Sequence, residues 1–153
     1  MSSNVINCQE CIFPPYPNKE LINFRAEKTN MDQPLDFNEV NRISFNNALI
    51  NNGNGYDTSA NQFKAPETGF YIFTTEILLE FVNPGNIEIE IRSNKRLIGS
   101  TGVLLSFQDE PVGFTAMTPL DADELVAVFI TPANTGFKAI ESAFTYFGGS
   151  ILR

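Results

Sequence analysis

The side chains of this sequence that could do chemistry are mostly carboxylates. The chain has 18 Asp and Glu residues, 10 Lys and Arg residues and no histidine. Without histidine there is no Ser-His-Asp triad and no imidazole base or metal ligand. Glu88 and Glu90 lie two apart in a predicted strand, which is typical of a solvated strand face rather than of an acid–base pair. The sequence therefore predicts that the protein is not an enzyme.

Calcium binding is a second use for carboxylates, because Ca²⁺ prefers about six to eight oxygen ligands. The candidate ligands are acidic residues in or beside predicted loops: Asp109, Glu110, Asp121 and Asp123. Loops at one end of a sandwich could bring such oxygens together, although the chain has no Asp-x-Asp-x-Asp-Gly loop. Asp57 lies within a predicted turn, where we expect its side chain to bond to the backbone instead. No other cofactor is expected.

Two cysteines, Cys8 and Cys11, lie close together near the N-terminus in the sequence CQEC. The spacing suits half of a zinc site or a redox pair. Zinc needs four ligands, however, and the chain has neither a histidine nor a third cysteine. A redox motif belongs at a strand-to-helix junction, and no helix is predicted here. We interpret the pair as exposed thiols in a tail; disulfides between chains, or a metal shared by several chains, are the alternatives.

The charge of the chain restricts its partners. The formal net charge is −8, which opposes binding to nucleic acid and to anionic membranes. No apolar run is long enough for membrane insertion, and the first ten residues show no signal peptide. A basic ligand or a cation fits this charge better.

The elements that must position these residues are strands. Residues 1–20 contain Pro-Pro-Tyr-Pro and are predicted to form a proline-rich arm or linker. Residues 87–91 alternate Ile with Glu, residues 70–81 alternate less cleanly, and residues 125–130 form a continuous apolar run that fits a buried strand. Turn signals about ten residues apart separate these runs. The pattern predicts an all-β sandwich or jelly roll.

The aromatic residues indicate self-association. The chain has 14 Phe and 4 Tyr, more than one core of this length easily hides. Exposed aromatic patches mark association surfaces. We therefore expect the domain to bind copies of itself.

One stretch carries a family resemblance. Residues 56–73 read YDTSANQFKAPETGFYIF. They resemble the globular head of complement C1q, a branch of the tumour necrosis factor superfamily, at Tyr56, Asp57, Phe63, Pro66, Gly69, Tyr71 and Phe73. The family has Thr-Gly where this chain has Ala60-Asn61, and Asn tolerates the left-handed conformation that Gly would supply. The segments 120–125 and 145–152 also resemble the family, with Ala122 in place of a glycine and Ser150 in place of an aromatic residue.

The resemblance covers about residues 21–153 and implies one domain. It implies a jelly-roll sandwich of about ten strands, assembled as a compact homotrimer. It also implies that the structural core includes Gly69, Tyr71, Phe73, Phe147 and Leu152. The function to expect is a non-enzymatic trimeric recognition head, extracellular or on a particle or cell surface, that binds a protein, peptide or glycan through its loops and lateral surfaces. The alternative is a structural tip or trimerisation module of a spore coat, fibre or virus particle.

Overall fold

A computed structural model describes residues 19–107 and 109–153. Cys8, Cys11 and residues 1–18 of the predicted arm lie outside the described residues. The described part of the chain contains no helix, and hence none that could span a membrane.

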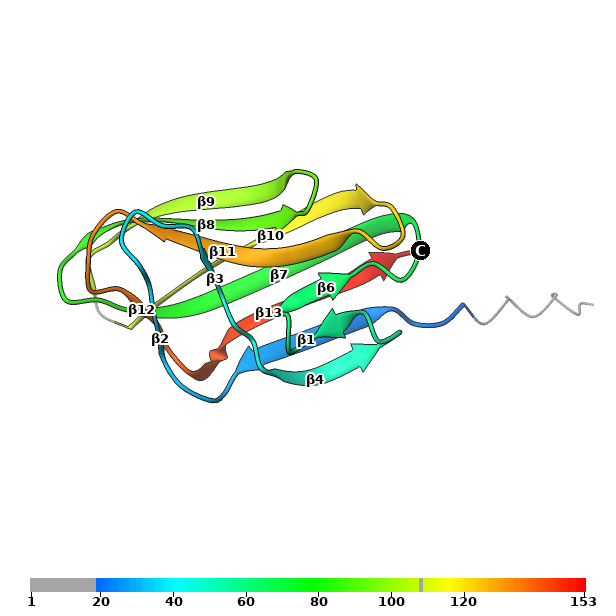
Figure 1. Cartoon of the computed structure of the whole chain (residues 1–153), viewed down its shortest axis with the longest axis horizontal. Coiled ribbons are helices and arrows are strands. Elements are labelled where there is room, and N and C mark those ends of the chain that lie inside the picture. The colour runs from blue at the N-terminus through cyan, green and yellow to red at the C-terminus, as the bar shows by residue number, and fades with distance from the viewer. Residues whose placement is uncertain (1–18, 108) are drawn as a thin grey trace, which may run out of the picture.

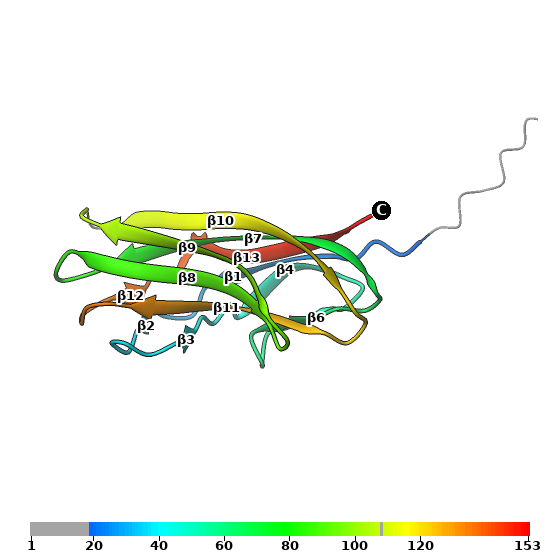
Figure 2. The same ribbon diagram turned by 90° about the horizontal axis from the view of Figure 1, so that it is seen from above.

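Two antiparallel sheets form the domain, and they lie one above the other as a sandwich (Figures 1 and 2). The seven-stranded sheet has the order β2 (Gln33–Pro34), β12 (Lys138–Ala139), β7 (Gly69–Glu80), β13 (Ser142–Leu152), β1 (Asn23–Lys28) and β4 (Asn47–Asn52), with β10 (Glu110–Leu120) also paired to β7. The six-stranded sheet has the order β5 (Tyr56–Asp57), β6 (Gln62–Lys64), β11 (Leu125–Pro132), β8 (Gly85–Ser93) and β9 (Leu97–Leu105), with β3 (Asn41–Arg42) also paired to β11. The predicted all-β jelly roll is confirmed.

Strand β7 shows why the sequence folds this way. Its side chains alternate strictly, and those of Tyr71, Phe73, Thr75, Ile77 and Leu79 are buried. The same period of two buries the isoleucines of β8 on the facing sheet. Because successive side chains in a strand point to opposite faces, each sheet contributes one apolar face to a common core.

Aromatic rings fill the centre of that core. Phe24 of β1 stacks on Phe63 of β6 at 4.8 Å and on Tyr56 of β5 at 5.0 Å, so it joins the two sheets. It also meets Phe147 of β13 edge to face at 5.0 Å, and Phe147 stacks on Phe73 at 5.8 Å. These are favourable aromatic geometries, each adding roughly 0.5–1.5 kcal/mol beyond area burial.

Leu152 is not part of this core, contrary to the sequence-based expectation. It pairs with Phe70 across β13 and β7, and paired residues point to the same face. Phe70 alternates with buried Tyr71, so both Phe70 and Leu152 face outward and are 45% and 44% exposed. Ile151, one residue earlier, is the buried member of this strand end. Gly69, at the start of β7, is partly exposed, while a Cβ there would lie 2.6 Å from Ile151 Cδ1.

The turn after β5 confirms two further expectations. Asp57 Oδ1 accepts hydrogen bonds from the Ser59 hydroxyl (2.6 Å) and from the backbone N–H groups of Ser59 (2.8 Å) and Ala60 (3.1 Å). These bonds favour the charged form and lower the pKa of the Asp57 carboxyl. Asn61 adopts a left-handed φ of 51°, as expected for a residue that replaces glycine. Its side chain also accepts a bond from the Phe45 N–H at 2.9 Å.

Replacing Gly149 by alanine is expected to destabilise the domain by about 1–3 kcal/mol through overpacking. A Cβ at this position would lie 2.6 Å from Phe73 Cδ1 and 2.8 Å from Phe24 Cε1, and both rings are held in the core. Denaturant unfolding at one protein concentration measures the change. The matched control is Gly102→Ala in β9, where the nearest atom, the Ile87 carbonyl oxygen, is 3.9 Å away. Equal stability of the two variants would contradict this packing.

Candidate functional site: the open face of the seven-stranded sheet

The four carboxylates predicted as calcium ligands do not come together. Asp109 and Glu110 lie at the start of β10, and Asp121 and Asp123 follow its end. The strand has 11 residues, and at roughly 3.4 Å per residue the two pairs are separated by about 35 Å. One ion therefore cannot bind all four.

The two pairs of carboxylates at the ends of β10 have different neighbours. Asp121 is paired with Lys95 at 2.7 Å, and Asp123 is paired with Lys64 at 2.8 Å. A hydrogen bond and charge from Lys95 lower the pKa of the Asp121 carboxyl. Glu110 has one buried carboxylate oxygen that lacks a hydrogen-bond partner. Among residues 19–107 and 109–153, no group of three or more acidic side chains is placed to hold a metal ion, and calcium binding stays a prediction.

The open face of the seven-stranded sheet is the surface turned away from the core. On β7, β13 and β10 it is built in rows: Phe70 lies between Leu152 and Pro119, and Ile72 lies between Ser150 and Met117. Met117 is 57% exposed. Apolar side chains thus continue across three neighbouring strands in the first row and across β7 and β10 in the second, so that they form one surface rather than isolated exposed residues.

The open face of the six-stranded sheet differs. Along β8 the outward positions are Glu88, Glu90 and Arg92, which alternate with the buried isoleucines. Of these, Glu88 is exposed, while Glu90 is buried and pairs with Arg92. The open face of the six-stranded sheet therefore carries charged side chains along β8, whereas rows of apolar side chains cross the other open face.

A groove of about 440 Å³ runs over this open face between β1, β13, β7 and β10. The sheet face is hollowed here because Gly148, which has no side chain, lies in register between Thr74 of β7 and Arg25 of β1. The Arg25 guanidinium lies over the Tyr146 ring at 4.0 Å and pairs with Glu27 at 3.1 Å. The charged group at the groove is thus already neutralised, so the groove can pack against another apolar surface without leaving a lone charge.

The position of this surface was not predicted from the sequence, although its existence was. The one sequence feature that pointed to this surface was the imperfect alternation of apolar and polar residues over 70–81. Phe70, Ile72 and Leu78 are apolar like their buried neighbours, whereas the outward positions Thr74, Glu76 and Glu80 are polar. Apolar residues at the start of the outward face, where a wet face would have polar ones, were the available hint.

Comparison with known proteins agrees with this fold. Residues 23–152 match the C1q domain. No curated protein matches the chain.

Solved structures show the same architecture at low sequence identity. Murine APRIL is 12% identical, with a TM-score of 0.65 over 88% of this chain and 100% of that one. The globular domain of zebrafish complement 1qA protein is 14% identical, with a TM-score of 0.63 over 88% and 98% of the two chains. Eiger TNF from S. frugiperda is 11% identical, with a TM-score of 0.63 over 88% and 94%. The family match covers nearly all of the described residues, and this chain belongs to the C1q domain family.

Proposed function

We propose that the chain is the non-enzymatic recognition head of a homotrimer that works outside the cell or on a cell or particle surface. C1q and TNF-like domains typically form trimeric recognition heads. The observation that carries the proposal for this chain is the apolar, in-register surface on β7, β10 and β13. Contiguous exposed apolar patches of this kind mark interaction sites.

The distribution of charge supports assembly through this surface. Three chains at −8 repel one another, so the acidic residues must mostly lie away from the contact. Glu88 and Glu90 lie on the opposite sheet, and Asp121 and Asp123 lie in a loop with lysine partners. The centre of the apolar surface, around Ile72, has Ser150 and Met117 as its cross-strand neighbours.

Light scattering of the full chain at micromolar concentration tests the assembly. We expect about three times the chain mass of 17.0 kDa, and we expect the trimer to persist at high salt because salt screens the repulsion while apolar contacts remain. A monomer at moderate salt would overturn the proposal. A glycan and protein array screened with the assembled oligomer then tests recognition, and a trimer that binds no member would favour a purely structural module.

A further inference from the structure

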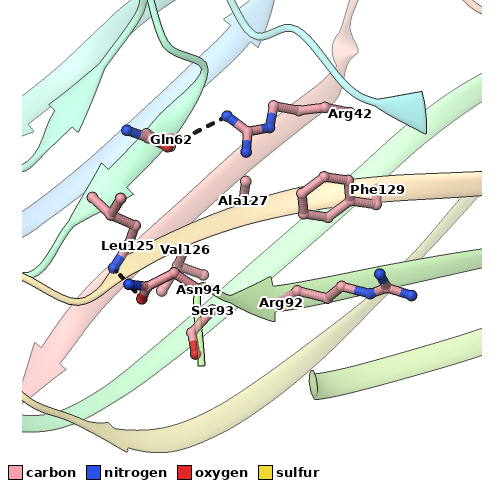
Figure 3. A pocket seen from close by; sticks show the side chains of 9 residues that line it. All are labelled: Arg42, Gln62, Arg92, Ser93, Asn94, Leu125, Val126, Ala127 and Phe129. Carbon is pink, nitrogen blue, oxygen red and sulfur yellow. Dashed lines mark hydrogen bonds between the residues drawn. The ribbon is translucent and has the colours of Figure 1, made fainter. Parts of the chain in front are cut away.

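The open face of the six-stranded sheet carries a small hollow of about 80 Å³ (Figure 3). Ala127 of β11 lies among the residues that line it. Val126 and Val128 belong to the core, so the Ala127 side chain points to the open face, yet it is only 4% exposed. Longer side chains around it therefore form a rim, and the small methyl group leaves the space inside that rim empty.

Two arginines from different strands belong to this rim. The Arg42 guanidinium of β3 lies over the Phe129 ring at 5.3 Å, and the Arg92 guanidinium of β8 lies over the same ring at 5.7 Å. Phe129 pairs directly with Arg42 in the sheet. Cation–π contacts of this kind position guanidinium groups, so Phe129 holds one guanidinium from the strand on each side of β11.

The two arginines differ in their partners. Arg92 pairs with Glu90 at 2.5 Å, whereas Arg42 Nη1 bonds to neutral acceptors, the Ala60 carbonyl at 3.2 Å and Gln62 Oε1 at 3.3 Å. Every other arginine of the described chain has a carboxylate partner: Arg25 with Glu27, Arg92 with Glu90, Arg96 with Glu124 and Arg153 with Glu67. In a chain of net charge −8, one arginine at a hollow thus has no carboxylate partner among residues 19–107 and 109–153.

The other polar side chains of the hollow have their acceptor oxygens engaged. The Ser93 hydroxyl oxygen accepts from the backbone N–H groups of Lys95 and Arg96, both at 3.1 Å. Gln62 Oε1 accepts from Arg42, and Asn94 Oδ1 accepts from the Leu125 N–H at 3.1 Å, as the dashed lines of Figure 3 show. With both amide oxygens engaged, the NH₂ groups of Gln62 and Asn94 remain to bond a ligand, together with the free N–H groups of Arg42. A site with unused donors and one net positive charge suits an anion that also carries hydroxyl acceptors.

We propose that this hollow binds the carboxylate of a sugar acid such as a uronic acid. The planar guanidinium fork matches a carboxylate, and a single uncompensated charge matches a monoanion better than a dianion. The amide donors suit the hydroxyl oxygens of a sugar ring. A peptide fits less well, because β11 lies inside its sheet between β6 and β8 and offers no free edge for strand addition.

The proposal names a ligand class for the recognition role given above and rests on that role. It does not rest on the trimer contact, because Arg42, Phe129 and Ala127 belong to one chain and to the other sheet. Mass and glucuronate binding, measured on the same sample, therefore test the trimer and the ligand site separately. Loss of the trimer with binding retained would overturn only the proposed assembly.

Ligand-observed NMR titration of the full chain with D-glucuronate tests the site, and D-glucose serves as the uncharged control. We expect saturable glucuronate binding and at least about tenfold weaker binding of glucose. Arg42→Gln should weaken glucuronate binding at least about tenfold by removing the charge. Ala127→Leu should do the same by filling the hollow. The matched control is Arg153→Gln, which removes the same charge from an arginine paired with Glu67 and should leave binding unchanged.

Three outcomes would overturn the proposal. The first is glucose binding as tight as glucuronate binding. The second is unchanged glucuronate binding in a folded Arg42→Gln protein, with circular dichroism as the check of folding. The third is tighter binding of N-acetylglycine, which would assign the site to a peptide carboxylate, or of inorganic phosphate, which would assign it to a dianion.

Discussion

Replacing Tyr71 by alanine is expected to lower the free energy of unfolding by about 3–5 kcal/mol, the range found for truncation of large buried aromatic side chains. Tyr71 is fully buried and meets Phe63 edge to face at 5.6 Å, so the variant leaves a void between the two sheets. Its hydroxyl donates a hydrogen bond to the Glu67 carbonyl at 2.7 Å. Burial raises the pKa of this hydroxyl, so that it remains a donor at neutral pH.

Tyr71→Phe is the matched control, because it keeps the ring and removes only the hydrogen bond. We expect it to cost about 1 kcal/mol, well below the alanine variant. Unfolding in denaturant should be compared at one protein concentration, since assembly makes apparent stability depend on concentration. If the alanine variant melted within a degree or two of the parent, Tyr71 would not hold the sheets together as described.

The sequence predicted the fold class because the relevant signals are local. A period of two over residues 87–91 indicates a strand with one wet face, and turn residues about ten positions apart indicate short antiparallel strands. The side chains of Tyr71, Phe73 and Phe147 are buried as expected. The wrong prediction for Leu152, in contrast, has a non-local cause. At the end of β13 only the pairing with β7 decides which residue of the Ile151–Leu152 pair points inward, and pairing is not visible in the sequence.

The hollow that Arg42 lines on the six-stranded sheet is a feature that the sequence could not predict. Its lining comes from β3, β6, β8 and β11 and from the turn after β8, segments that adjoin only through the sheet. Strand β3 has two residues, too few for any periodic signal. The lack of a carboxylate beside Arg42 in the described part of the chain is also a property of three-dimensional placement, since carboxylates pair with each of the other four arginines.

Replacing Met117 by aspartate is expected to dissociate the trimer. Met117 is 57% exposed in the single chain, so an aspartate there is solvated and should change the stability of the isolated fold little. In the assembly it would lie beside Ile72 on the apolar surface, where burying an unpaired carboxylate costs several kcal/mol per chain. Three added negative charges would also increase the repulsion between chains that already carry −8 each. Light scattering at micromolar concentration should show the mass fall to about 17.0 kDa.

The matched control is Leu104→Asp on β9, which makes the same kind of change on the open face of the other sheet. Leu104 pairs with Asn86 of β8 and is 65% exposed, so the charge of this variant stays in water whether or not the chains assemble. We expect it to remain a trimer, while glucuronate binding survives in both variants. If Met117→Asp stayed trimeric and Leu104→Asp became monomeric, the contact between chains would lie on the six-stranded sheet. The hollow that Arg42 lines would then face a neighbouring chain instead of solvent.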